Sequence, residues 1–400
     1  MAITIDSAPS NQFHLAYRPV VWTVSSNDAN IVRCIADIYI EGVYSVTLEK
    51  SPDIGTTDTF TFDFQSVLQD NLASHVPNFT DNSQTLVVLD SVINYLPVFY
   101  EVLDNGTTYD TSWAENGAGS SGTSASGFYT PNLIQAINGT LRHEETQDLT
   151  VFEDNGTYGT LSRGFKPTTT YDGASCNVVK STRIGDFIPI NGYRYSAITM
   201  RGKLIQYDSS DTGISTTYAG SITSSYVGWL YYIDTSILAS NCAKILARIE
   251  TTGASATTSY VHYKIVSDCD DYVSLYWQNS LGGIDYYLFR DGQVRAVEGN
   301  TTTFVKPLTT SYNVYDFGET VLNKSGRWSI NANSEVLSRT DADWLSELST
   351  HAVRAWVYVD SKFIPVIISD VKMETINTFD GTYRINIELL YSNKTIAQRY

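Results

Sequence analysis

Short runs in which apolar and polar residues alternate recur along most of the chain, and they constrain its fold more than any other feature. Residues 31–40, 43–48 and 59–64 are the clearest examples. Because successive side chains of a strand point to opposite faces of a sheet, this period of two predicts half-buried β-strands. The intervening segments, such as 25–28 and 51–55, are short and polar, which favours antiparallel pairing of neighbouring strands.

Further runs extend this pattern and are broken by two helix signals. Runs with strand character are 19–24, 85–89, 96–103, 193–200, 226–233, 260–266, 273–277, 352–359, 363–368 and 383–391. The spacing of apolar residues predicts a short helix over 65–72. A second helix is expected near the C-terminus, with Thr340 as its cap, Asp343 three residues later, and Trp344, Leu345 and Leu348 as its apolar face.

The sequence therefore predicts an all-β chain of two or three antiparallel β-sandwich-like modules, with a short C-terminal helix packed on a sheet. Residues 116–127 consist mainly of Gly, Ser and Ala and have the composition of a flexible loop. We take this loop as the seam between an N-terminal β domain, 1–115, and a central β domain, 128–310. A C-terminal β domain with one helix, 311–400, completes the expected division. The Asn-Gly pairs at 105, 138, 155 and 191 favour tight hairpin turns.

The charge balance excludes one class of function. The 400 residues contain 43 acidic and 26 basic residues, which gives a formal net charge of −17 at pH 7. A protein that grips nucleic acid needs a basic stripe that neutralises phosphates, so sequence-specific nucleic-acid binding is not expected. An acidic lumen that lets DNA pass without holding it is compatible with this charge.

Targeting signals and cysteine spacing give the expected location. No apolar run reaches the ~18 residues of a membrane span, so we expect no membrane insertion. The first ten residues lack the pattern of a secretory signal, which favours synthesis in a cytoplasm. Cys34, Cys176, Cys242 and Cys269 form no C-x-x-C pair and are expected to be free, buried thiols.

Motifs of known chemistry are weak or missing in the sequence. His143 is followed by two glutamates but lacks the second histidine of a zincin helix. Asp268 and Asp270 could hold calcium, but they lack the rest of an EF-hand loop, and a solvated turn is favoured. Two acids of a glycosidase could meet from distant strands, which sequence alone does not exclude. We expect no catalytic residue, no cofactor and no metal.

The most distinctive segment is 275–289, LYWQNSLGGIDYYLF. We expect a strand to end at Trp277, a turn over 279–283, and a return strand over 284–289. Gly282 and Gly283 allow backbone angles closed to other residues, and Asn279 can bond its own backbone. Together with Trp277 and Asp285 these residues are predicted to form a structural corner.

This segment also carries a resemblance. Asp268-Cys269 followed by the W-x-N-x-L-G-G-I-D pattern of 277–285 resembles a signature of virion proteins from phages and prophages of Bacteroidota, including the crAss-like group. The order of segments 17–21, 42–43, 60–64 and 67–70, and of 344–349 and 364–368, is similar as well. The resemblance implies a tail, connector or baseplate component, located in the virion, and it brings no catalytic residue.

Three functions are compatible with these sequence features. The expected function is a non-enzymatic structural protein that assembles symmetrically with copies of itself and contacts other tail or portal proteins. The 28 Tyr and 7 Trp suit such interfaces. The same residues could stack on sugars, so the alternative is a carbohydrate-binding or receptor-binding tail fibre. A polysaccharide hydrolase is the third candidate.

Overall fold

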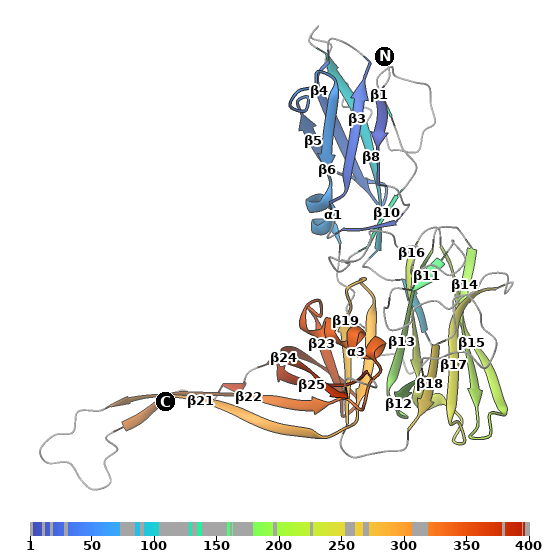
Figure 1. Ribbon diagram of the computed structural model, residues 1–400, viewed down its shortest axis with the longest axis vertical. Helices are drawn as coiled ribbons and strands as arrows, with labels where there is room; N and C mark the ends of the chain where they lie inside the picture. Colours follow the sequence, from blue (N-terminus) through green and yellow to red (C-terminus); the bar gives the residue numbers. More distant parts are fainter. Residues whose placement is uncertain are drawn as a thin grey trace, which may run out of the picture.

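The computed structural model describes residues 3–9, 13–16, 19–27, 31–72, 85–88, 92–103, 128–129, 134–137, 158–160, 162, 179–194, 198–224, 227–252, 261–266, 272–305, 319–377, 381–393 and 395–396. The fold is all-β, built from five mainly antiparallel sheets (Figure 1). Two pairings, β2 with β10 and β12 with β18, are parallel. No helix in this described part is long and apolar enough to cross a membrane.

The N-terminal module is a sandwich of two sheets. One has the order β1-β3-β6, and the other has the order β2-β10-β8-β4-β5 with β9 paired to β8. Their strands are β1 (Ile3–Ser7), β2 (Phe13–Leu15), β3 (Val21–Ser26), β4 (Ile31–Ile40), β5 (Val43–Lys50), β6 (Thr59–Asp63), β8 (Val92–Leu103), β9 (Phe128–Tyr129) and β10 (Ile134–Ile137). The predicted first helix is confirmed as α1 (Gln65–Asn71).

Alternation explains how this sandwich closes. Along β3 every second side chain is buried, so Trp22 and Val24 face the other sheet. There the Trp22 and Phe99 rings lie 5.9 Å apart between centroids. Leu68 of α1 joins the same core. Burial of apolar area of this kind is the main stabilising contribution to such a module.

The central module is a second sandwich. Its sheets have the orders β11-β13-β16-β7 and β12-β18-β17-β14-β15. The strands are β7 (Thr85–Val88), β11 (Tyr158–Thr160), β12 (Val179–Thr182), β13 (Phe187–Arg194), β14 (Ile198–Tyr207), β15 (Gly213–Ser224), β16 (Val227–Asp234), β17 (Lys244–Thr251) and β18 (Val261–Ile265), and a 3-10 turn, η3 (Thr235–Ile237), follows β16. The single strand expected over 193–200 is wrong, since β13 ends at Arg194 and β14 begins at Ile198.

Close packing between the two central sheets gives a first prediction. A Cβ atom on Gly202 would lie 2.6 Å from the ring of Tyr231, whose side chain is fully buried. We expect Gly202→Ala to lower the free energy of unfolding by about 1–3 kcal/mol, because the ring has no room to retreat. Gly220 in the neighbouring edge strand β15 has nothing within 4 Å and is the matched control. Urea denaturation should separate the two variants; equal midpoints would contradict this packing.

The C-terminal module is one eight-stranded sheet with the order β20-β19-β23-β24-β25-β22-β21, with β26 paired to β22. Its strands are β19 (Val273–Gln278), β20 (Ile284–Phe289), β21 (Gln293–Val305), β22 (Glu319–Asn333), β23 (Ala355–Val359), β24 (Lys362–Asn377), β25 (Thr382–Tyr391) and β26 (Thr395–Ile396). The helix α3 (Arg339–Leu345) continues into the 3-10 turn η4 (Ser346–Ser349), and Trp344, Leu345 and Leu348 pack into the core of this sheet. A short C-terminal helix therefore packs on a sheet.

The cap of α3 differs from the expected one. Ser338, not Thr340, is the N-cap, and its hydroxyl accepts a hydrogen bond from the amide of Asp341 at 3.2 Å. The same hydroxyl donates to the Asp341 carboxylate at 2.7 Å. The helix begins two residues earlier than the sequence suggested, because Ser338-x-x-Asp341 and Thr340-x-x-Asp343 both fit the pattern of a capping box.

Sheet membership does not follow the expected boundaries at 115, 128 and 310. β9 and β10 pair with β8 in the N-terminal module, and β7 pairs with β16 in the central one. β19, β20 and β21, expected in the central domain 128–310, belong to the C-terminal sheet, so that sheet begins well before residue 311. Alternation predicts where a strand lies, but pairing is decided by contacts between residues far apart in the chain. The Gly/Ser-rich segment 116–127 lies outside the described residues.

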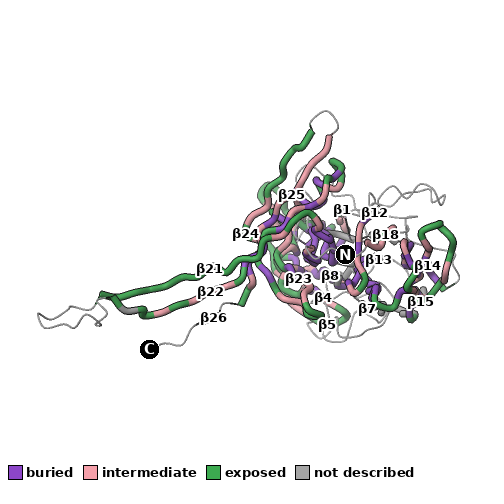
Figure 2. The backbone as a smooth tube through the Cα atoms, turned by 90° about the horizontal axis from the view of Figure 1, so that it is seen from below, coloured by how far each residue is buried: buried purple, intermediate pink, exposed green. Residues whose placement is uncertain are grey.

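Two hairpins project from the C-terminal sheet (Figure 2). The longer one consists of β21 and β22, and the shorter one of the distal parts of β24 and β25. Most residues of the longer hairpin are exposed, whereas the base of the sheet is buried.

Candidate functional site

The β19–β20 hairpin, which contains the distinctive segment of the sequence, lies between two cores. Every residue of both strands is buried. Leu275, Trp277 and Phe289 belong to the core of the C-terminal module. Tyr276 and Tyr286 point the other way and belong to the core of the central module. Strands buried on both faces need apolar side chains on both faces, which explains why this segment is apolar almost throughout.

The turn of this hairpin is built by Asn279. Its side-chain oxygen accepts hydrogen bonds from the amides of Leu281, at 3.0 Å, and Gly283, at 2.9 Å. The backbone N–H of Asn279 in turn donates to the Gly283 carbonyl at 2.9 Å. Gly282 has a φ of 81°, which favours glycine at this position. Asn279, Gly282 and Gly283 thus lie together in a tight corner.

Trp277 and Asp285 are direct cross-strand neighbours that both contact α3. The Trp277 ring lies 5.4 Å from the Trp344 ring, centroid to centroid. The indole nitrogen of Trp344 donates to the Asp285 carboxylate at 2.7 Å. Near the turn, Ser280 donates to the Glu347 carboxylate of η4 at 3.1 Å. The corner is therefore attached to the helix by both packing and hydrogen bonds.

Lys180 of β12 brings the central module to the same helix. Its ammonium nitrogen lies 3.2 Å from the centroid of the Trp344 ring, a cation–π contact, and the residue is buried. Burial lowers the pKa of Lys180 to about 7, although attraction to Asp285 acts in the opposite direction. Burial likewise raises the pKa of Asp285, and Lys180 opposes that shift.

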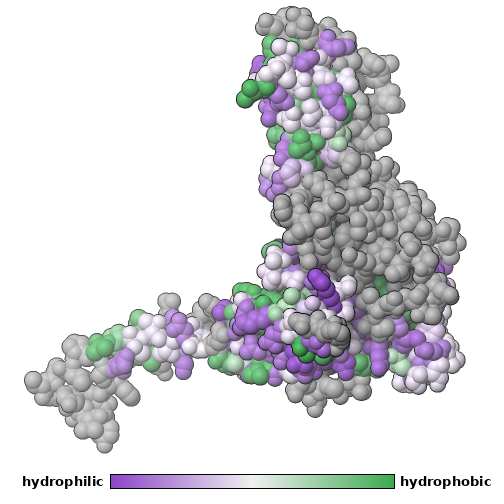
Figure 3. Space-filling view, viewed as in Figure 1, coloured by the Kyte–Doolittle hydropathy of each residue, from purple (hydrophilic) through white to green (hydrophobic). Residues whose placement is uncertain are grey.

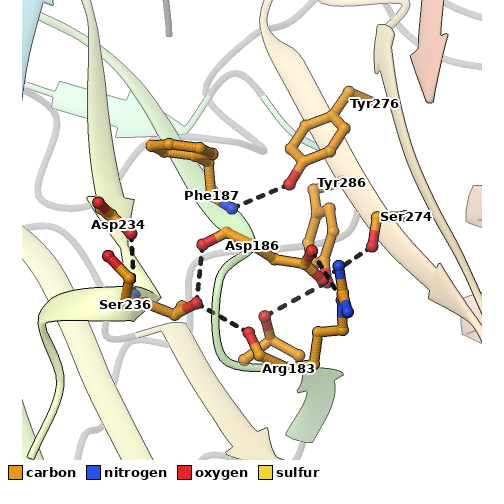
Figure 4. Close-up of polar contacts among 10 residues, drawn as sticks. Arg183, Asp186, Phe187, Asp234, Ser236, Ser274, Tyr276 and Tyr286 are labelled. Carbon is orange, nitrogen blue, oxygen red and sulfur yellow. Dashed lines mark hydrogen bonds and ion pairs between the residues drawn. The ribbon is translucent and has the colours of Figure 1, made fainter. Parts of the chain in front are cut away.

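A second polar centre lies around Asp186, just before β13 (Figure 4). Its carboxylate accepts hydrogen bonds from the Tyr286 hydroxyl at 2.7 Å and the Ser274 hydroxyl at 2.8 Å. The Arg183 guanidinium donates to it at 3.1 Å. Burial raises the pKa of Asp186, and these donors limit the rise. Asp186 thereby connects the central module to both strands of the buried hairpin.

Two more contacts complete the connection. The Tyr276 hydroxyl accepts a hydrogen bond from the amide of Phe187 at 3.0 Å. The Asn191 side chain accepts from the amide of Ile284 at 2.9 Å and donates to the carbonyl of the same residue. The hairpin turn expected at Asn191-Gly192 is therefore wrong. Both residues lie inside β13, where Asn191 binds the backbone of the facing strand.

We name this set the junction: Lys180, Arg183, Asp186, Asn191, Ser274, Tyr276, Asn279, Asp285, Tyr286 and Trp344. Hydrogen bonds of Asp186, Tyr276 and Asn191 and the cation–π contact of Lys180 cross the boundary between the central and C-terminal modules. Buried polar groups need partners of this kind for stability. Within the described ranges, no group of three or more His, Cys, Asp and Glu side chains could hold a metal ion.

Sequence reasoning identified the corner residues but not Lys180, Asp186 or Asn191. The segment 178–190 did contain a signal, since the charged residues Lys180, Arg183 and Asp186 lie in a run that is otherwise rich in Val, Ile and Phe. Buried charges are rare unless paired, so charges in such an apolar run indicate buried partners.

Only some of the other candidate residues from the sequence lie within the described ranges. Cys34 and Cys242 are free, buried thiols as predicted. His143, Asp268, Asp270, Cys176 and Cys269 lie outside the residues that the structure describes. Of the tryptophans that are described, Trp22, Trp229, Trp277, Trp344 and Trp356 are buried, and Trp328 is exposed.

Comparison with known proteins adds no identification. No family model matches the sequence. No characterised protein gives a significant sequence match.

Proposed function

We propose that this chain is a non-enzymatic structural component of a bacteriophage virion, a tail, connector-ring or baseplate protein that acts through symmetric self-assembly. Its partners are then copies of itself and adjoining tail or portal proteins. The virion is its place of action, after synthesis in the cytoplasm of the host bacterium. The proposal joins the resemblance of segment 268–285 to virion proteins with one observation, the long hairpin of β21 and β22.

That hairpin carries the proposal because it exposes apolar side chains away from the core. Trp328 is 50% exposed, and Val294, Phe304, Val321 and Leu322 are also exposed. An uncovered apolar ribbon is an aggregation hazard, and natural proteins place such surfaces in contacts with other chains. A structural subunit needs such a contact surface, because it must reach and bind its neighbours.

The junction supports a structural function too. It connects the central and C-terminal modules through Asp186, Lys180 and Asn191, and a rigid connection between modules suits a subunit that transmits contacts. The alternative of a glycan-binding fibre needs exposed aromatic rings as a stacking platform. The exposed aromatic rings of the described residues, Tyr44, Tyr218, Phe304 and Trp328, are spread over three modules. This spread favours the structural proposal over a single stacking platform.

Electron microscopy of the purified chain over a range of concentrations tests the proposal. We expect rings or stacked oligomers, and no retention of duplex DNA at ordinary salt, because the chain carries a net charge of −17. A monodisperse monomer at all concentrations would count against self-assembly. Release of reducing ends from host glycans would favour the hydrolase instead, and saturable glycan binding would favour the fibre.

A further inference from the structure

The β21–β22 hairpin leaves the sheet as a two-stranded ribbon. Among the described residues, β22 pairs with β25 over Ser329–Asn333 and with β26 at Ser325 and Gly326 alone. We name residues 294–305 and 319–328 the arm. At ~3.3 Å per residue, its twelve-residue strand extends about 40 Å. It points away from the body of the chain in both views (Figures 1 and 2).

One face of the arm is the continuation of a core face. Ile330 and Ala332 of β22 are buried in the C-terminal core. Trp328 lies two residues before Ile330, so it lies on the same face of the strand. The register places Val297 of β21 directly opposite Trp328. Yet Val297 is 58% and Trp328 is 50% exposed, against 1% for Ile330.

The apolar face therefore extends one cross-strand pair beyond the core, to Val297 and Trp328, without a cover from the described part of the same chain. The next pairs on this face are Gly299–Gly326 and Thr301–Lys324. Hydrophobic residues are visible along the arm in the space-filling view (Figure 3). An isolated two-stranded ribbon is marginally stable in water, and it needs a further strand or surface to pack against. Among the described strands of this sheet β21 is the outermost, so its edge can pair with another strand.

The charge of the arm indicates which surface covers it. The arm carries Arg295, Lys324 and Arg327 against Glu298 and Glu319, so it is slightly basic. The complete chain has a net charge of −17, so the rest of it is strongly acidic. A basic arm on an acidic body is complementary to the body of another copy, and complementary charge fixes partner and orientation.

From this geometry we infer that the arm docks on the acidic body of the next copy of the same chain, with the Val297–Trp328 pair as its apolar anchor. The contact is heterologous, because the arm of one copy meets a different surface of the next, and repetition of such a contact closes a ring or extends a stack. This inference rests on the proposed self-assembly and names its contact surface.

The test replaces the anchor and leaves the body unchanged. The double variant Val297→Ser with Trp328→Ser alters two exposed side chains and should preserve folding. Sedimentation over a concentration series should show self-association weakened about 30-fold or more, as expected for loss of a central aromatic anchor. Val353→Ser is the matched control, since Val353 is an equally apolar, 89% exposed residue of the body. It should assemble like the unmodified protein.

Two further measurements separate the contact from the proposed function. Reversing Lys324 and Arg327 to glutamate should weaken assembly most at low salt, because screening reduces the attraction. A photo-crosslinker at position 328 should give dimers joined through the body of a second copy. Rings that form normally without the anchor would overturn the inference and leave the proposed function standing. Crosslinks confined to one chain, or to a different virion protein, would also overturn it. An unmodified protein that never associates would overturn both.

Discussion

Replacing Asp186 by alanine is expected to lower the free energy of unfolding by about 3–5 kcal/mol, the loss typical of breaking a buried charged contact. The substitution removes the acceptor of the Tyr286 and Ser274 hydroxyls and of the Arg183 guanidinium. Buried donors without an acceptor are costly, because they have also lost their hydrogen bonds to water. The measurement is urea denaturation followed by tryptophan fluorescence and, in parallel, by circular dichroism.

The expected transition changes shape as well as position. Asp186 connects the central module to the hairpin of the C-terminal sheet. Without this contact the two modules should unfold at different urea concentrations, so the transitions followed by fluorescence and by circular dichroism should no longer coincide in Asp186→Ala. Ser274→Ala is the graded control, since it removes one donor and should cost about 1 kcal/mol. A single unshifted transition in Asp186→Ala would show that the contact does not hold the modules together.

The second large effect concerns Lys180 and Asp285. Each single substitution, Lys180→Met or Asp285→Asn, removes one member of a buried, mutually attracting pair and should cost about 3 kcal/mol. The double variant should lose less than the sum of the two single losses, because it leaves no uncompensated charge. Strict additivity of the two losses would contradict the attraction between these residues.

The same lysine gives a pH dependence of defined sign. Its pKa is about 7 in the folded protein, against 10.5 for an ordinary lysine. Between these values the unfolded chain binds more protons at this lysine than the folded chain does. The destabilising effect of burying Lys180 therefore shrinks, and the free energy of unfolding increases, as the pH rises. From pH 7 to pH 9 the gain should be about 2 kcal/mol, and below pH 7 the contribution is constant. Lys180→Met should lack this gain, which unfolding midpoints at the two pH values would reveal.

Local patterns predicted individual strands well. β4 (Ile31–Ile40) matches the expected range, because its run rich in Ile and Val ends at the turn residues Glu41-Gly42. The pairing of β7 with β16 could not be predicted, since nothing within residues 85–88 specifies a partner more than a hundred residues away. A local pattern of apolar residues contains no information about a partner strand so far away in the sequence.

The junction shows the same division between local and distant information. Asn279, Gly282 and Gly283 were predictable, because a turn is determined by its own residues. Asn191 was misread because its tendency to form turns is local, whereas the backbone of Ile284, which it binds, is distant in sequence. Lys180 and Trp344 meet only where the central module contacts the C-terminal module, and no spacing rule connects them.

The continuity of β22 has a mechanical consequence. The strand runs without interruption from the arm at Glu319 into the sheet at Asn333. Its hydrogen bonds to β25 lie across the strand direction. A pull along the arm therefore loads these bonds in shear, so that they resist together and do not open one after another. Tension on the arm passes directly into the sheet that holds the buried hairpin.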